Sequence, residues 1–185
     1  MKTKFINQEI KYIGSQLSPL WIYKNFNLLG DAIVSFVGEV DVCLDEMVDV
    51  EDVINNEPIY SKKMLNFIIE QFDISLIGMV YAQRLFISII KDEIEATGVK
   101  INRDGDDLFY DSRKLSVSIA TKSINSCLIH TGLNIIKEGA PIQASDLTEI
   151  GIVNIEEFAQ RVMQKYKEEL QSIKMATYKV RGVID

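Results

Sequence analysis

The chain has 185 residues, enough for one hydrophobic core, and we expect a single domain over residues 1–185. Hydrophobic residues make up 47% of it and charged residues 25%, a balance that excludes an intrinsically disordered protein. The net charge of −7 comes without a basic cluster, so we expect no nucleic acid partner, and no apolar run is long enough to predict a membrane partner.

Cysteine and histidine usage limits the chemistry further. Cys43 and Cys127 are far apart in the sequence, and His130 is the only histidine, so a zinc site of thiols and imidazoles is excluded. The first residues lack the apolar core of a signal peptide. We therefore expect a protein of the reducing cytoplasm.

The first half of the chain predicts two strands and two helices. Short apolar stretches predict strands at residues 20–24 and 33–42. Ser61 is a candidate N-cap for a helix with apolar residues up to Phe72. A second helix is predicted over residues 75–97, ended by Gly98.

The second half predicts hairpins and a last helix. Strands are expected at 99–102 and 107–111 around an Asp-Gly turn, then from Lys114 to Ala120 and at 127–136. Asn154, with Glu157 three residues later, predicts the start of the last helix. Because helices and hairpins are segregated, we expect an α+β fold with a mostly antiparallel sheet and helices packed against it.

The segment from Lys114 to Ala120 alternates apolar and polar residues. Leu115, Val117 and Ile119 are predicted to point one way, and the lysine and two serines the other way. A lysine with only small polar neighbours leaves room for a ligand carboxylate or phosphate. The alternative is a charge on an edge strand that discourages aggregation.

These residues also resemble a known superfamily. The motif Arg-Lys-Leu-Ser-x-Ser-x-Ala at 113–120, Asp-Leu at 107–108 and His-Thr-Gly-Leu-Asn-Ile at 130–135 are similar to core segments of the biotin/lipoate protein ligases and octanoyltransferases. A further similarity runs from Ala144 through Ile152 into the last helix. The resemblance implies the fold of those proteins and identifies the chain as a distant branch of the superfamily.

The resemblance also implies roles for individual residues. Lys114 would contact the acyl carbonyl or phosphate of a ligand, and His130 would take part in catalysis or supply a hydrogen bond. The alternative for His130 is a hydrogen-bonded structural residue. The implied ligand-binding residues are Arg113, Ser116, Ser118, Gly132 and Asn134.

Two departures from the superfamily stand out. Members that form an acyl-adenylate carry a glycine-rich loop with two arginines, whereas residues 36–43 contain one glycine and no arginine. Ile150 occupies the position where octanoyltransferases carry their thioester cysteine. Neither known chemistry is therefore complete in this chain, and the cofactor is left open between Mg²⁺, a nucleotide and none.

An acidic segment between Asp41 and Glu57 has seven acidic residues and no Lys or Arg. Three interpretations remain open: a solvated loop or helix start, a lid that presents carboxylates to a cationic ligand or partner, and a Mg²⁺ or Ca²⁺ site at Asp49 and Asp52.

The sequence therefore favours a protein that binds a small carboxylate or acyl compound at the lysine strand, with acyl-transfer or ligase-type chemistry. The rival hypothesis is a non-catalytic ligand-binding or dimerising module of the same fold. A homodimer is left open.

Overall fold

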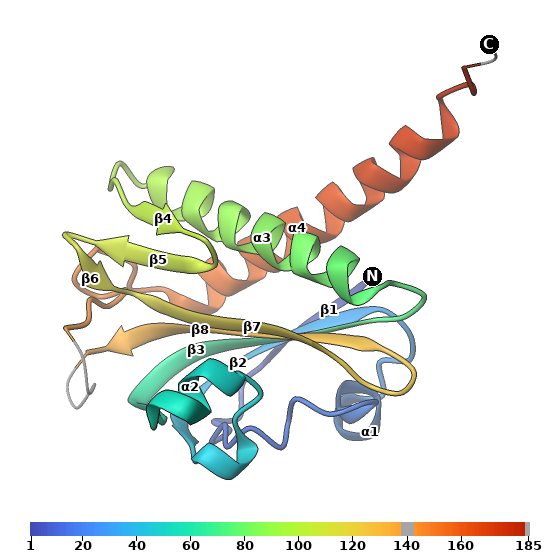
Figure 1. The fold of residues 1–185 in the computed structure, drawn as a ribbon. Helices are drawn as coiled ribbons and strands as arrows, with labels where there is room; N and C mark the ends of the chain where they lie inside the picture. The colour runs from blue at the N-terminus through green and yellow to red at the C-terminus, as the bar shows by residue number, and fades with distance from the viewer. Residues whose placement is uncertain (138–142, 184–185) are drawn as a thin grey trace.

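The structure is a computed structural model that describes residues 1–137 and 143–183. A mixed five-stranded sheet has the order β1-β2-β3-β8-β7, and a smaller sheet has the order β4-β5-β6 (Figure 1). The strands are β1 Lys2–Ile6, β2 Ala32–Val42, β3 Ile59–Gln71, β4 Asn102–Asp104, β5 Asp107–Tyr110, β6 Arg113–Lys114, β7 Ser116–Lys122 and β8 Cys127–Ile136. The helices are α1 Trp21–Phe26, the 3-10 helix η1 Leu44–Glu46, α2 Val50–Asn55, α3 Leu76–Glu95 and α4 Ile155–Tyr178.

The predicted α+β fold is confirmed, with one difference in the sheet. β1 pairs with β2 in parallel, whereas the β2·β3, β3·β8 and β7·β8 pairs are antiparallel. The central strands are buried on both faces, as expected for strands covered on both sides.

The two long helices cover one face of the large sheet (Figure 1). Both begin as the sequence predicts: Ser75 Oγ accepts a hydrogen bond from Gly78 N, and Asn154 Oδ1 accepts one from Glu157 N. Phe86 of α3 lies between Phe67 of β3 and Tyr166 of α4, in edge-to-face contacts with both rings. This packing forms the larger of two cores.

The opposite face carries α1, the N-terminal segment before it and a second core. The segment runs beside β2, where Tyr12 N donates to Glu39 O and Asp41 N donates to Tyr12 O. Gly38 permits this approach, because a Cβ at that position would lie 1.9 Å from the carbonyl oxygen of Ile10. The N-terminal segment thereby holds Tyr12 over the sheet.

Two predicted elements are of the wrong type, and the strand predicted at 99–102 is displaced to β4, Asn102–Asp104. Residues 20–24 contain most of helix α1 and are not a strand; Leu20 N donates to the Glu70 carboxylate, and this tertiary contact accompanies the helical turn. The helix predicted from Ser61 is strand β3. Its apolar residues fit a helical period by coincidence, because a strand buried on both faces has no alternation to display.

The alternation predicted around the lysine holds only after Leu115. Leu115 lies between β6 and β7 and packs in the core under α3, whereas Val117 packs against the second core on the other face. An interruption of the strand at this point exchanges the faces of the residues on its two sides. Leu115 and Val117 therefore do not share a face.

Candidate functional site

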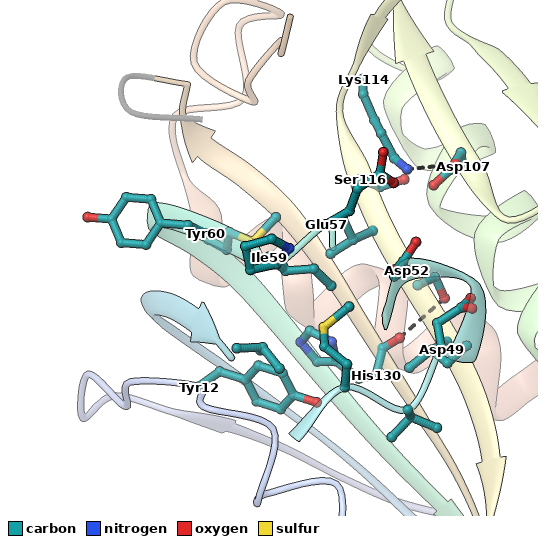
Figure 2. Close-up of a pocket in the computed structure, with 18 of the residues that line it drawn as sticks. Tyr12, Asp49, Asp52, Glu57, Ile59, Tyr60, Asp107, Lys114, Ser116 and His130 are labelled. Atoms are coloured by element: carbon teal, nitrogen blue, oxygen red, sulfur yellow. Dashed lines mark hydrogen bonds and ion pairs between the residues drawn. The ribbon is translucent and has the colours of Figure 1, made fainter. Parts of the chain in front are cut away.

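A cavity of about 620 Å³ lies on the sheet face opposite α3 and α4, under the acidic segment (Figure 2). The acidic segment contains the short helices η1 and α2, and residues of both line the cavity. Apolar side chains make much of its floor: Tyr12, Val42, Met47, Ile59, Met64, Val117 and Ile119. The predicted lysine strand thus lies at a concave surface.

Lys114 lies at one end of this cavity. Its Nζ forms an ion pair of 2.8 Å with Asp107 of β5, and the side chain keeps 29% of its surface exposed (Figure 2). The backbone is fixed by Lys114 N donating to Gln143 O and Ser145 N donating to Lys114 O. A well-held backbone with an accessible amine can present positive charge to a ligand.

His130 lies in the floor and stacks on Tyr12, with ring centroids 3.7 Å apart. Its Nε2 is 3.0 Å from Asn66 Oδ1, and Asn66 Nδ2 donates to Met64 O, so Nε2 carries the proton of this pair. Burial lowers the pKa of His130 from 6.5 to about 3. The imidazole is therefore neutral near pH 7, with Nδ1 as an acceptor.

Carboxylates form the wall beside Lys114. Asp49, Asp52 and Glu57 all line the cavity, and Asp49 Oδ1 caps α2 by accepting from Glu51 N. Burial raises the pKa of Asp52, and the nearby charges of Asp49 and Glu57 raise it further. Lys114 opposes that rise, so its charge is close enough to act on Asp52.

The predicted serines line the cavity, but their hydroxyls are engaged. Ser116 Oγ accepts from Leu108 N, and Ser118 Oγ accepts from Gln83 Nε2 and donates to His130 O. These hydrogen bonds tie the edge of the cavity to strand β5 and helix α3.

Asn134 lines the cavity and ties strands together. Its Oδ1 accepts from Ser61 Oγ, and its Nδ2 donates to Ser145 O. Gly132 lies just behind the floor, where a Cβ would lie 3.1 Å from Met64 Sδ and 3.3 Å from Val117 Cγ2. Asn134 therefore shapes the cavity wall directly, and Gly132 supports it from behind.

Arg113 does not join this group. Its guanidinium forms two hydrogen bonds of 2.9 and 2.5 Å with Glu149, and it is absent from the cavity lining. The hydrogen bonds from Arg113 and Lys137 lower the pKa of Glu149 to about 2. This arginine stabilises the surface beside the lysine and is not part of the cavity.

Several residues of the site could not be predicted from the sequence. Tyr12 gave no signal, because only the fold brings the N-terminal segment over β8. Met64 was assigned to a helix. Asp107 stood in the resembling motif. It lies two residues before Phe109, the partner of Lys114 across the β5–β6 hairpin, and so shares a strand face with it, which could have indicated the ion pair.

Metal ligands are sparse. No group of three or more His, Cys, Asp or Glu residues that could hold a metal ion occurs within residues 1–137 and 143–183. Asp49 and Asp52 both face the cavity, and a Mg²⁺ site there stays a prediction, since Mg²⁺ commonly takes one or two protein carboxylates.

Within residues 1–137 and 143–183, no helix has the length and apolar character needed to span a bilayer.

Solved structures share this fold. A biotin protein ligase from Aquifex aeolicus in complex with biotin and ATP aligns with a TM-score of 0.64 at 14% identity, over 93% of this chain and 72% of that one. A lipoate-protein ligase A bound with ATP aligns with a TM-score of 0.58 at 14% identity, over 92% and 86%. The protein therefore has the fold of the biotin and lipoate protein ligases, as the sequence resemblance implied.

Closer relatives define the family. A protein of unknown function from Pyrococcus horikoshi has a TM-score of 0.94 at 35% identity, with 99% of both chains covered. The uncharacterized protein MJ0805 of Methanocaldococcus jannaschii is 35% identical over 179 residues, which are 94% of this chain and 81% of that protein. The model of the family described as a domain of unknown function, DUF366, matches residues 1–181, and the chain belongs to that family.

Proposed function

We propose that this protein binds a small carboxylate or acyl compound in the cavity under the acidic segment. The observation that carries the proposal is the position of Lys114 at one end of a cavity with an apolar floor. The apolar floor suits an acyl chain, and the ammonium suits a carboxylate or the charge that develops on an acyl carbonyl.

Within this proposal Lys114 exchanges its partner. Its ammonium pairs with Asp107, and a ligand carboxylate competes for the same ammonium. His130 contributes a neutral acceptor, because its low pKa keeps the ring unprotonated near pH 7. Acyl transfer is the reaction class that this arrangement favours.

Binding without turnover is the second candidate function. Residues 36–42 lie in strand β2 and contain no glycine-rich loop to hold a nucleotide phosphate. Ile150, at the position of the octanoyltransferase cysteine, is buried in the core with 3% of its surface exposed. These two observations favour a module that binds its ligand and leaves it unchanged.

The test is thermal unfolding with octanoate, lipoate, biotin and ATP, each with and without Mg²⁺. A compound that binds only the folded state raises Tm in proportion to the logarithm of its concentration above Kd. We expect one of the acids to raise Tm for the wild type and for Arg113→Gln, but not for Lys114→Gln. Both substitutions remove a positive charge from neighbouring residues, but of the two only Lys114 lines the cavity. A rise that survives in Lys114→Gln would contradict the proposal.

Turnover separates the two candidates. If the protein is an enzyme, incubating it with ATP, Mg²⁺ and the acid that it binds yields an adenylate. Alternatively, incubating it with the thioester of that acid and an amine acceptor yields an amide. The absence of both products with an acid that does bind would favour the non-catalytic module.

A further inference from the structure

The charge of the cavity wall does not match an anionic ligand alone. Among the described residues, six carboxylate side chains line the cavity, and Lys114 is the only basic one. Asp107 already pairs with that lysine, and Asp106 pairs with Arg84 at 2.8 Å. The remaining four carboxylates, which have no ion-pair partner among the described residues, are Glu46, Asp49, Asp52 and Glu57.

Two of these four carboxylates, those of Asp52 and Glu57, line the cavity together with Lys114 (Figure 2). Asp52 and Asp49 are half-buried in this wall, and Glu57 is exposed beside them. A positive group placed among these carboxylates would offset their mutual repulsion, whereas Lys114 is already paired with Asp107.

A second observation comes from the floor of the cavity. His130 has 3% of its surface exposed and makes one hydrogen bond to the described residues, through Nε2. Glu93 Oε1 is the only buried side-chain nitrogen or oxygen without a hydrogen-bond partner in the described part of the chain, so the unbonded Nδ1 is open to the cavity. Nδ1 of a neutral ring with a protonated Nε2 accepts hydrogen bonds and cannot donate them.

The acidic wall and the floor of the cavity therefore both offer acceptors. An ammonium that enters the cavity can donate to these acceptors and offset the negative charge of the wall, so this surface favours a ligand that brings donors. A plain fatty acid brings none, since its carboxylate only accepts.

We infer that the ligand carries an ammonium group next to its carboxyl or acyl group, as in an amino acid with a long apolar side chain. The inference rests on the proposed function and adds to it. The carboxyl end faces Lys114, the ammonium lies against Asp52 and Glu57, and the apolar chain lies on the floor beside Tyr12 and Met64.

The test compares three probes with the same chain length: octanoate, 2-aminooctanoate and octylamine. Isothermal titration in the presence of EDTA gives the affinities without a divalent ion to supply the positive charge. We expect 2-aminooctanoate to bind the wild type at least about tenfold more tightly than octanoate, which corresponds to about 1.4 kcal/mol. In the double variant Asp52→Asn with Glu57→Gln this preference disappears, and octanoate binds as well as the amino acid.

Glu51→Gln is the matched control, because Glu51 lies on the same helix as Asp52 and does not line the cavity. Asp49 is left unchanged, since its carboxylate caps that helix. Circular dichroism of each variant establishes that it is folded.

The outcomes separate the two proposals. Equal binding of octanoate and 2-aminooctanoate, both lost in Lys114→Gln, overturns this inference and supports the proposed function. Binding of octylamine as tight as that of the amino acid, unchanged in Lys114→Gln, overturns the proposed function and supports a cationic ligand at the acidic wall.

Discussion

Tyr12 and His130 stack face to face, with ring centroids 3.7 Å apart and planes inclined by 11°. The contact joins the N-terminal segment to β8 and closes the floor of the cavity. Tyr12 is 3% exposed, and its hydroxyl has no hydrogen bond to the described residues. The ring, and not the hydroxyl, is therefore the part of Tyr12 that stabilises the fold.

We expect Tyr12→Ala to lower the free energy of unfolding by about 3 kcal/mol, because it leaves a cavity and removes the stack. Tyr12→Phe keeps the ring and should change it by less than about 1 kcal/mol. Urea denaturation measures both variants. A Tyr12→Phe loss as large as that of Tyr12→Ala would show that the hydroxyl matters.

Burial of His130 predicts a pH dependence of stability. The folded ring has a pKa of about 3, against 6.5 for an unperturbed histidine. Between these values the unfolded state binds more protons, so stability is highest above pH 6.5 and falls as the pH is lowered towards 3. From about pH 7 to about pH 5 the loss due to this ring is about 2 kcal/mol.

His130→Gln isolates that contribution from the titration of carboxylates. Glutamine does not titrate, so the difference in free energy of unfolding between wild type and variant should shrink by about 2 kcal/mol over the same pH range. Urea denaturation at several pH values supplies the comparison. A difference that does not vary with pH would contradict a neutral, buried imidazole.

The sequence predicts the elements whose signals are local. The helix cap at Asn154 and the turn at Gly105 are short-range hydrogen-bond and backbone effects, and the structure contains both. Strand β3 has a helix-like spacing of apolar residues because both of its faces are buried, one in the core under α3 and α4 and the other in the second core, and these covering elements are not visible in the strand's own sequence. Tertiary contacts, not propensity, decided that segment.

The same distinction applies to the site. Lys114 could be found because its motif is contiguous and resembles that of a known superfamily. Tyr12 could not, since its position depends on a parallel bridge to Val40 and on the close approach allowed by Gly38. The acidic character of the cavity wall was visible in the sequence, but its place above Lys114 requires the fold.

Gly132 supports the floor of the cavity from behind. In Gly132→Ala the new methyl group would lie 3.1 Å from Met64 Sδ and 3.3 Å from Val117 Cγ2. Because both side chains line the cavity, we expect them to move into it, with a loss of about 1 kcal/mol of stability and a severalfold weaker binding of the acid ligand. Titration of the variant with the acid that raises the Tm of the wild type checks the second effect.

A double variant tests the physical reason. If the methyl group acts by crowding Met64, then Gly132→Ala costs less stability in a Met64→Ala background than in the wild type. Equal costs in both backgrounds would locate the crowding elsewhere.

Gly38 is the position where the backbone of the N-terminal segment comes closest to β2. A Cβ there would lie 1.9 Å from the carbonyl oxygen of Ile10 and 2.6 Å from its carbonyl carbon, and neither is the end of a flexible side chain. We expect Gly38→Ala to push the segment away, to lower the free energy of unfolding by about 3 kcal/mol or more, and to separate Tyr12 from His130. Gly182→Ala is the matched control, since a Cβ at Gly182 meets nothing within 4 Å.

The displaced segment should also change the titration of His130. Because Tyr12 would no longer shield the imidazole in Gly38→Ala, the pKa of His130 should rise towards 6.5, which NMR titration of the single histidine can follow. A stable Gly38→Ala variant whose histidine still titrates near pH 3 would show that the N-terminal segment does not depend on this glycine.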